Sequence, residues 1–127
     1  SIDANDLLVH TEIARKFISN DDLRPSMTGV YLHEQNGEVK VAGTDAHRLY
    51  YNTIFKGEML SGLKAILPRK CVLLLSQFKN QKVLIEFSES HVKVTSDKYE
   101  LISRLITARY PDYEVVLPKE NNYFFAT

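Results

Sequence analysis

The sequence has one cysteine, no long apolar run and no recognisable export signal. Because Cys71 is the only cysteine in 127 residues, the chain cannot form an internal disulfide, which agrees with a reducing cytosol. The longest apolar run covers residues 71–75, whereas a membrane-spanning helix needs about 20 apolar residues. The first six residues are polar and acidic, so we expect no signal peptide.

The sequence also lacks net charge. Sixteen basic and sixteen acidic residues give a formal charge of zero at pH 7. A domain that holds nucleic acid through phosphate contacts alone is usually strongly basic. The balance therefore argues against tight binding of free DNA by this chain alone. The length and the 44% hydrophobic content suit one compact globular domain.

Motifs for bound cofactors and for covalent catalysis are missing as well. The sequence contains no glycine-rich phosphate loop and no nucleophile motif. We therefore expect no cofactor. Cys71 lies in a leucine run, where a small buried hydrophobic side chain is the simplest interpretation.

The apolar spacing predicts an α+β domain. A strand end at 1–4 and an amphipathic helix at 6–19 precede a strand at 30–34, and Asn36-Gly37 is a strong hairpin signal. The expected strands are 30–34, 38–42, 49–55, 64–67, 82–87, 91–95 and 99–106, with a second helix at 69–78 after Pro68.

The pattern of a helix followed by three strands occurs twice. Val39-Lys40-Val41 and Val92-Lys93-Val94 lie 53 residues apart, and Asp45 precedes Asp97 by 52. The fold class we predict is therefore a pseudo-symmetric pair of helix-plus-antiparallel-strand repeats, about 1–56 and 63–107. In each repeat the helix should cover one face of the strands. An extended, docked segment should follow the second repeat, because Pro111 and Pro118 disfavour a helix there.

The stretch 41–50 brings an acid, an imidazole and a guanidinium together where a strand breaks into a turn. Asp45 and His47 could be metal ligands or an acid–base pair, which would make the chain a small metal-dependent hydrolase. Such a site needs a third partner, and no other histidine has ligand spacing. The alternative is that Asp45 caps the turn, on which a partner docks. A stand-alone peptide-binding module is a third possibility.

The basic residues allow two readings. Arg15 and Lys16 lie on the first predicted helix, and Arg69 and Lys70 lie on the second. They could form solvated helix faces, or both helices could present a weakly basic face to a polyanion. Spacing alone does not decide between these readings.

Four patches resemble the beta subunit of bacterial DNA polymerase III, the sliding clamp. The patches are 24–29, 44–49, 67–70, and 110–113 together with 116–119, in the order and approximate spacing of that family. The resemblance covers the middle domain of a three-domain protein, here 1–118. Residues 119–127 resemble a linker and the first strand of the third domain.

The resemblance implies a DNA clamp fold and a non-catalytic processivity factor in the bacterial cytoplasm at the nucleoid. Two subunits form a head-to-tail ring around duplex DNA, with helices lining the hole and sheets outside. The DNA polymerase III alpha subunit, the clamp loader and repair polymerases bind through a short apolar motif. The implied DNA-facing residues are Arg24, Arg15, Lys16, Arg69 and Lys70.

The resemblance also implies this domain's share of a peptide-binding cleft between the middle and third domains. The implied lining residues are Met27, Thr44, Ala46, His47, Arg48, Leu49 and Pro118. Two departures from the family pattern stand out: Ala46 occupies a position where the family commonly has glycine, and Pro25-Ser26 replaces an aromatic pair. The first adds a methyl group to the expected pocket floor, and the second affects a secondary subsite and a DNA contact.

Overall fold

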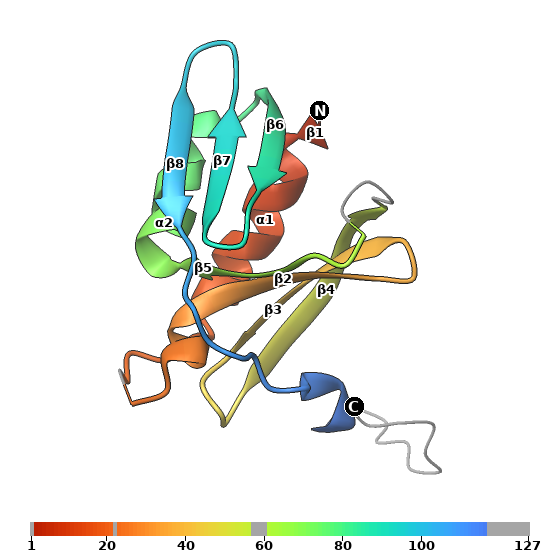
Figure 1. Cartoon of the computed structure of the whole chain (residues 1–127), viewed down its shortest axis with the longest axis vertical. Coiled ribbons are helices and arrows are strands. Elements are labelled where there is room, and N and C mark those ends of the chain that lie inside the picture. Colours follow the sequence, from red (N-terminus) through yellow and green to blue (C-terminus); the bar gives the residue numbers. More distant parts are fainter. Residues whose placement is uncertain (1, 22, 57–60, 117–127) are drawn as a thin grey trace, which may run out of the picture.

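The computed structural model describes residues 2–21, 23–56 and 61–116, which form two four-stranded antiparallel sheets and two neighbouring helices (Figure 1). The elements are β1 (Ile2–Asp3), α1 (Ala4–Arg15), η1 (Pro25–Thr28, a 3-10 helix), β2 (Gly29–Gln35), β3 (Glu38–Thr44), β4 (Leu49–Lys56), β5 (Lys64–Pro68), α2 (Arg69–Leu74), η3 (Leu75–Phe78, 3-10), β6 (Lys82–Phe87), β7 (His91–Thr95), β8 (Glu100–Arg104) and η4 (Tyr113–Val116, 3-10).

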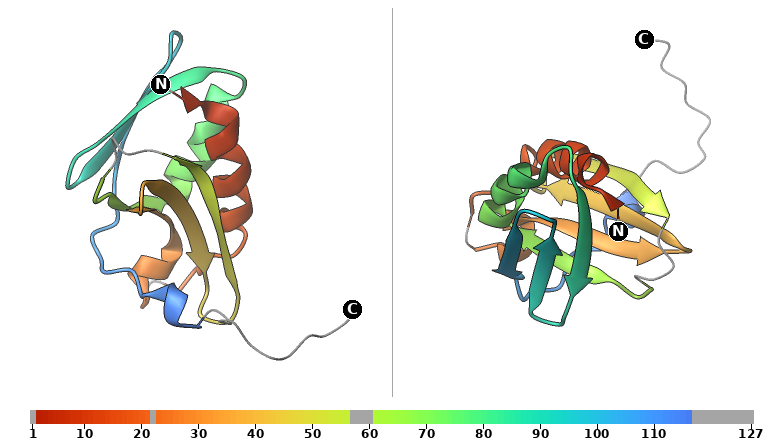
Figure 2. Two further views of the ribbon diagram at one scale, coloured as in Figure 1. Left: turned by 90° about the vertical axis from the view of Figure 1, so that its right-hand side faces the viewer. Right: turned by 90° about the horizontal axis from the view of Figure 1, so that it is seen from above.

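Each repeat gives its first strand to the sheet of the other repeat. The strand orders are β4-β3-β2-β5 and β1-β6-β7-β8. β5 pairs with β2 through Val30 and Leu67, and β1 pairs with β6 through Ile2 and Val83. α1 and α2 lie side by side across the junction of the two sheets (Figure 2). The α+β fold class with two pseudo-symmetric repeats is therefore confirmed.

The core lies between the helix pair and the inner faces of both sheets. Ala14 and Thr11 of α1 are fully buried, and the Thr11 hydroxyl donates to the Leu7 carbonyl at 2.8 Å. The paired valines noted in the sequence supply equivalent positions of β3 and β7, each at most 2% exposed: Val39, Val41, Val92 and Val94. Cys71 belongs to this core, as expected, and burial raises the pKa of its thiol.

Several element boundaries differ from the sequence predictions. The second helix, expected over 69–78, is α-helical only to Leu74 and continues as the 3-10 helix η3, and the strand expected over 99–106 covers Glu100–Arg104. The first helix ends at Arg15, because the amides of Lys16 and Phe17 bond to carbonyls three residues back and tighten the chain into turns. β3 continues to Thr44 instead of stopping at Ala42. The segment expected to be extended after the second repeat contains the 3-10 turn η4.

Among the described residues, no helix has the length and apolar character needed to cross a membrane.

Gly43 allows the end of α1 to pack closely against the end of β3. A Cβ atom at this position would lie 2.4 Å from the Ala14 carbonyl oxygen, closer than any real Cβ contact. The missing side chain lets the last turns of α1 rest directly on the strand. The glycine thus fixes the distance between the helix end and the β3–β4 turn.

Replacing Gly43 with alanine should destabilise the protein by about 1–3 kcal/mol, because the clashing atom belongs to the helix backbone and cannot rotate away. Urea denaturation followed by circular dichroism measures the change. Asn52→Ala on the neighbouring strand, where the side chain is exposed, is the control and should alter stability by less than about 0.5 kcal/mol. Equal stability of Gly43→Ala and wild type would contradict the close approach of helix and strand.

Candidate functional site

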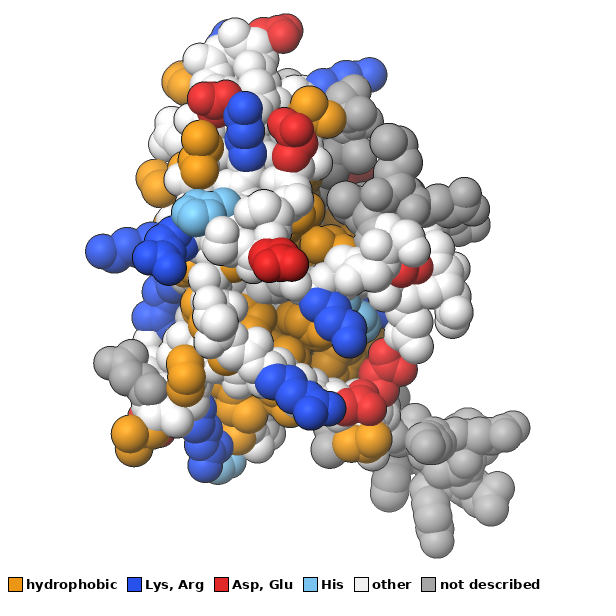
Figure 3. All heavy atoms as spheres, in the orientation of Figure 1, with side chains coloured by type: hydrophobic (Ala, Val, Ile, Leu, Met, Phe, Trp, Pro, Cys, Tyr) orange, Lys and Arg blue, Asp and Glu red, His pale blue; other side chains and the backbone are white. Residues whose placement is uncertain are grey.

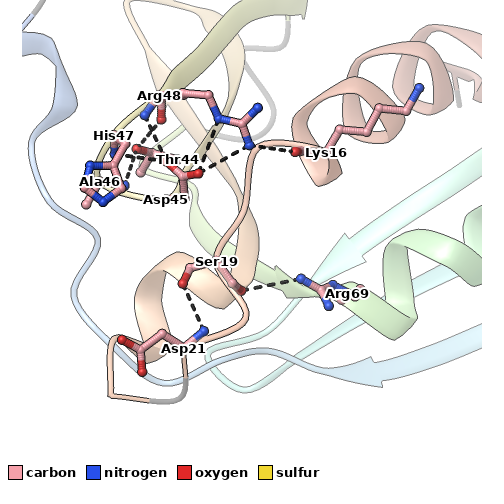
Figure 4. Close-up of polar contacts among 9 residues, drawn as sticks. All are labelled: Lys16, Ser19, Asp21, Thr44, Asp45, Ala46, His47, Arg48 and Arg69. Carbon is pink, nitrogen blue, oxygen red and sulfur yellow. Dashed lines mark hydrogen bonds and ion pairs between the residues drawn. The ribbon is translucent and has the colours of Figure 1, made fainter.

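The turn between β3 and β4 is closed by backbone and side-chain hydrogen bonds (Figure 4). Thr44, the last residue of β3, pairs with Leu49, the first residue of β4. The Thr44 hydroxyl donates to the Arg48 carbonyl at 2.6 Å and accepts from the Ala46 amide at 3.1 Å. The Asp45 amide also donates to the Arg48 carbonyl, at 3.4 Å. These bonds close the turn into one compact shape.

Asp45 braces this turn with both carboxylate oxygens. Oδ1 accepts from the backbone amides of His47 and Arg48, each at 2.9 Å, and Oδ2 accepts from Nε and Nη2 of Arg48, each at 3.3 Å. The two backbone amides, with a smaller contribution from the Arg48 side chain, lower the pKa of Asp45 to about 2. The carboxylate is therefore ionised and fully engaged at neutral pH, which suits a structural brace and does not suit a general base.

Ala46 lies at the tip of the turn in a left-handed conformation, with φ of 79°. Glycine adopts this conformation without penalty, whereas an alanine there costs about 1–2 kcal/mol. The backbone thus retains the geometry that the expected glycine would favour. The methyl group of Ala46 is exposed at the tip.

Leu49 connects the turn to an apolar cluster on the outer face of the first sheet. It packs with Tyr31 and Ile106 around a buried group of four residues, Ala42, Ile66, Tyr110 and Tyr113. The side chain is half-buried, so part of it stays available at the surface. Leu49 is therefore an apolar contact whose position depends on both the turn and the segment after β8.

Met27 approaches the same cluster from another side. It lies in η1, where its carbonyl accepts from the Ser19 amide at 2.7 Å. Met27 lines a hollow of about 1,030 Å³ together with Ile106 and Tyr110, between η1, the outer face of β2 and β5, and residues 105–114. Figure 3 shows this hollow with a hydrophobic floor and charged side chains around it. Ile106 and Tyr110 thus belong both to the hollow that Met27 lines and to the apolar cluster that Leu49 contacts.

A second hollow, of about 540 Å³, separates the turn from the loop after α1. Asp45, His47 and Arg48 line one side, and the other side is formed by Lys16, Ile18, Ser19, Asn20, Asp21 and Arg24. Two of the residues expected to face DNA, Lys16 and Arg24, therefore border the turn expected to bind peptide. The two sets of candidate residues meet at this hollow.

The other basic candidates have different surroundings. Arg15 forms an ion pair with Glu12, and Arg69 donates to the Ser19 carbonyl at 3.4 Å, so both side chains hold local structure. Lys70 is exposed on α2. Lys16 and Lys70 are consequently the better candidates for contact with a polyanion. Pro118 lies outside the described residues, as does the segment 119–127.

The tyrosine cluster beneath the hollow was not identified as a functional feature from sequence. Tyr31 stacks on Tyr110 at 4.2 Å between ring centroids, and the Tyr113 hydroxyl lies 2.6 Å from Nε2 of His33. Burial raises the pKa values of both Tyr110 and Tyr113, and it lowers the pKa of His33. The signal was the alternation of Tyr31 and His33 along β2, which places both rings on one face.

Comparisons with known proteins agree with this fold. The chain matches a crystal structure of a DnaN sliding clamp (DNA polymerase III subunit beta) from Bartonella birtlesii bound to griselimycin, with a TM-score of 0.85 and 27% identity over 95% of this chain and 35% of that one. A sliding clamp from Pseudomonas aeruginosa, solved with a ligand, gives a TM-score of 0.82 at 25% identity and covers 94% and 34% of the two chains. The chain thus has the fold of a sliding-clamp domain.

Sequence comparisons narrow this class to a family. The beta sliding clamp of Rickettsia bellii (strain RML369-C) is 29% identical over 112 residues, which is 83% of this chain and 30% of that protein. The beta sliding clamp of Escherichia coli (strain K12) is 26% identical over 105 residues, or 80% and 29%. The model of the family "DNA polymerase III beta subunit, central domain" matches residues 5–112. The chain belongs to this family, and it spans about 30% of the length of these curated relatives.

The hydrolase hypothesis receives no support. The relatives and structural neighbours reported above are sliding clamps. Both oxygens of Asp45 are occupied within the turn. Among the residues that the structure describes, no three His, Cys, Asp or Glu side chains gather in a group that could hold a metal ion. Asp45 and His47 are therefore not retained as a catalytic pair.

Asp45→Asn should weaken the turn in a pH-dependent way. The folded pKa of Asp45, about 2, lies below its ordinary value of 3.8, so the carboxylate stabilises the fold above pH 3.8 and loses this effect as the pH falls through 2. The melting temperature of the variant should lie below that of wild type at pH 7, and the gap should close between pH 3.8 and pH 2. Calorimetric scans over this range measure the gap.

The matched control is Ser96→Ala in the β7–β8 turn. There the Ser96 hydroxyl accepts from the amides of Lys98 and Tyr99, so this turn is braced by a group that does not titrate. The stability gap of this control should not change over the same pH range. A gap for Asp45→Asn that is independent of pH would show that the carboxylate does not brace the turn as an ion.

Proposed function

We propose that this chain is the middle domain of a sliding clamp that acts as a non-catalytic processivity factor in DNA replication. The domain would extend through residue 118, and 119–127 would lead into a third domain. Two findings support this proposal: the family match over residues 5–112, and the coverage of about 30% of the curated relatives, which is the share expected of one domain in three.

In this proposal the whole protein is a head-to-tail dimeric ring that encircles duplex DNA without regard to sequence. The zero net charge is compatible with this role, because a topological tether does not need high affinity for phosphates. The ring would work in the bacterial cytoplasm, at the nucleoid. Its partners would be the DNA polymerase III alpha subunit, the clamp loader and repair polymerases.

The partners would bind in a peptide cleft of which this domain supplies one wall. The observation that carries this assignment is the Asp45-braced turn, which holds Leu49 against the apolar cluster that Met27 also approaches. Thr44, Ala46, His47 and Arg48 complete this side of the cleft, and Pro118 would extend it. A partner leucine or phenylalanine would bury its side chain between the apolar walls while turn groups bind its polar atoms.

The energetics favour one wall of a shared cleft over a complete peptide-binding module. Burying one partner side chain contributes roughly 1.5–3 kcal/mol, whereas micromolar affinity needs about 8 kcal/mol. Leu49 and Met27 together therefore supply too little apolar contact for tight binding. The remaining affinity would come from the third domain, so this chain alone should bind a clamp ligand more weakly than a complete clamp does.

The proposed DNA-facing residues divide by their contacts. Lys16 and Lys70 would form the weakly positive lining of the ring, because both side chains are exposed on or next to the helices. Arg24 would add to it from the edge of the second hollow. Arg15 and Arg69 would contribute charge at longer range, because their guanidinium groups bind Glu12 and the Ser19 carbonyl.

We propose that griselimycin, which is bound to the Bartonella birtlesii clamp, would occupy this cleft. Replacing Leu49 with lysine should then weaken its binding by about tenfold or more, because a charge replaces an apolar contact of roughly 1.5–3 kcal/mol. Met27→Lys should act in the same direction. Isothermal calorimetry on the full-length clamp measures the affinity, and the clamp-binding peptide of the alpha subunit is a second probe. Leu84→Lys on β6, where the leucine is 50% exposed, is the matched control and should bind as wild type does. Unchanged affinity in both Leu49→Lys and Met27→Lys would refute the cleft assignment.

Replacing Lys16 and Lys70 with glutamate in the full-length clamp should reduce processive synthesis several-fold, because the lining would repel phosphates where it now attracts them. The defect should grow as the salt concentration falls, since screening is then weaker. Product length on primed single-stranded DNA measures processivity. Lys82→Glu on β6 is the control, because this exposed lysine lies on a strand. Wild-type product lengths for the double variant at low salt would contradict the lining.

A further inference from the structure

Phe17 has contacts on two sides that tie the end of α1 to the cleft turn. It follows the helix end and is half-buried. Its ring stacks on Tyr50 with 5.8 Å between centroids and an interplanar angle of 27°. The guanidinium carbon of Arg48 lies 5.1 Å from the centre of the same ring, which is within the range of a cation–π interaction. Phe17 lines neither hollow and is not among the proposed cleft residues.

The guanidinium of Arg48 is thereby held by three different groups. Besides the Phe17 ring, it donates to the Asp45 carboxylate and, from Nη2, to the Lys16 carbonyl at 3.4 Å (Figure 4). The Asp45 carboxylate in turn holds the turn amides. Because the turn is internally rigid, contacts that fix Arg48 also fix the turn against the helix end.

Tyr50 provides a second attachment on the same side of β4. Its hydroxyl lies 2.9 Å from Nδ1 of His10, a residue of α1. Side chains alternate across a strand, so Arg48 and Tyr50 point toward the helix while Leu49 points to the opposite face. The inner-face contacts of these two neighbours therefore contribute to the position of Leu49, together with its packing in the outer apolar cluster.

We propose that Phe17 is a positioning residue for the peptide cleft: its ring holds Arg48 and Tyr50 against the end of α1 and so fixes the Asp45–Leu49 turn. Phe17 itself would not touch the bound peptide. This inference rests on the proposed cleft, and it adds that the affinity of the cleft depends on the end of a helix proposed to face DNA. A purely structural Phe17 would affect stability but not the geometry of the turn.

The test compares three variants, with affinity measured in the full-length clamp and with stability and NMR signals measured in the 127-residue chain. Phe17→Leu keeps apolar bulk but removes the ring, and Phe17→Tyr keeps the ring. Phe78→Leu makes the same deletion in the other repeat, where Phe78 is buried and contacts Tyr99. Calorimetry with griselimycin gives the affinity, thermal melting gives stability, and two-dimensional NMR gives the backbone amide signals of Ala46, His47 and Arg48.

Phe17→Leu should bind griselimycin about two- to fivefold more weakly, which corresponds to the loss of one exposed cation–π contact, and should shift the three amide signals. Phe17→Tyr should retain the affinity and the signals of wild type. Phe78→Leu should lower the melting temperature and leave both unchanged. Wild-type affinity in Phe17→Leu, or an equal loss in Phe78→Leu, would overturn the inference.

A failure of the proposed cleft is distinguishable from a failure of the inference. If the full-length wild-type clamp does not bind griselimycin, or binds it equally well after Leu49→Lys and Met27→Lys, the cleft assignment fails for this domain. The amide signals then decide the positioning role by themselves. Unchanged turn signals in Phe17→Leu overturn that role, and shifted signals that recover in Phe17→Tyr support it.

Discussion

The exchange of first strands between the two sheets is the constraint on which the rest of the structure depends. β1 completes the sheet of the second repeat and β5 completes the sheet of the first, so neither repeat can bury its apolar face alone. The helix pair then closes a single core between both sheets. Closing this core requires α1 to lie close to β3, and Gly43 provides the space at the closest point. The helix end, the strand end and the turn are therefore placed by the same packing.

The turns of the two repeats share the amide contacts of one side chain, but only the first turn has a left-handed residue, Ala46, and builds a candidate site. Asp45 and Ser96 each accept two amides, and their own amides donate to the carbonyls of Arg48 and Tyr99. β3 has seven residues and β7 has five. The structural equivalent of Asp45 is therefore Ser96, whereas the sequence spacing had suggested Asp97.

This difference in strand length accounts for the difference between the two turns in the proposed cleft. The residue that follows the turn is Leu49 in the first repeat, and it pairs with Thr44. In the second repeat the corresponding residue is Glu100, which pairs with Thr95 and forms an ion pair with Lys93. An apolar side chain of a partner would gain no favourable contact from the carboxylate of Glu100. The asymmetry of the proposed cleft within a symmetric fold thus follows from one leucine and from two additional residues of β3.

The sequence was sufficient for the fold class because hydrophobic spacing and the Asn36-Gly37 turn are local signals. Helix ends were less predictable: α1 stops at Arg15, while the apolar spacing continues through Ile18, which is buried by the turn that follows. The braced turn was predictable from Asp45, since aspartate at such a position caps its own backbone. The contacts of Phe17 and Tyr113 were not, because they join residues 31 and 80 positions apart in the chain.

The zero net charge of the domain and the incomplete cleft proposed for it both limit the affinity of the domain for its ligands. A domain with a weak lining and one wall of a cleft binds neither DNA nor peptide strongly by itself, so in the proposed clamp its affinity for both would arise on assembly. A closed ring stays on DNA because it encircles the duplex, so it does not need strong phosphate binding. A facing domain adds the missing apolar contacts of the cleft. What the domain must supply alone is geometry: a rigid turn, a fixed Leu49 and a helix end at a fixed distance. The contacts of Gly43, Asp45 and Phe17 each supply one of these.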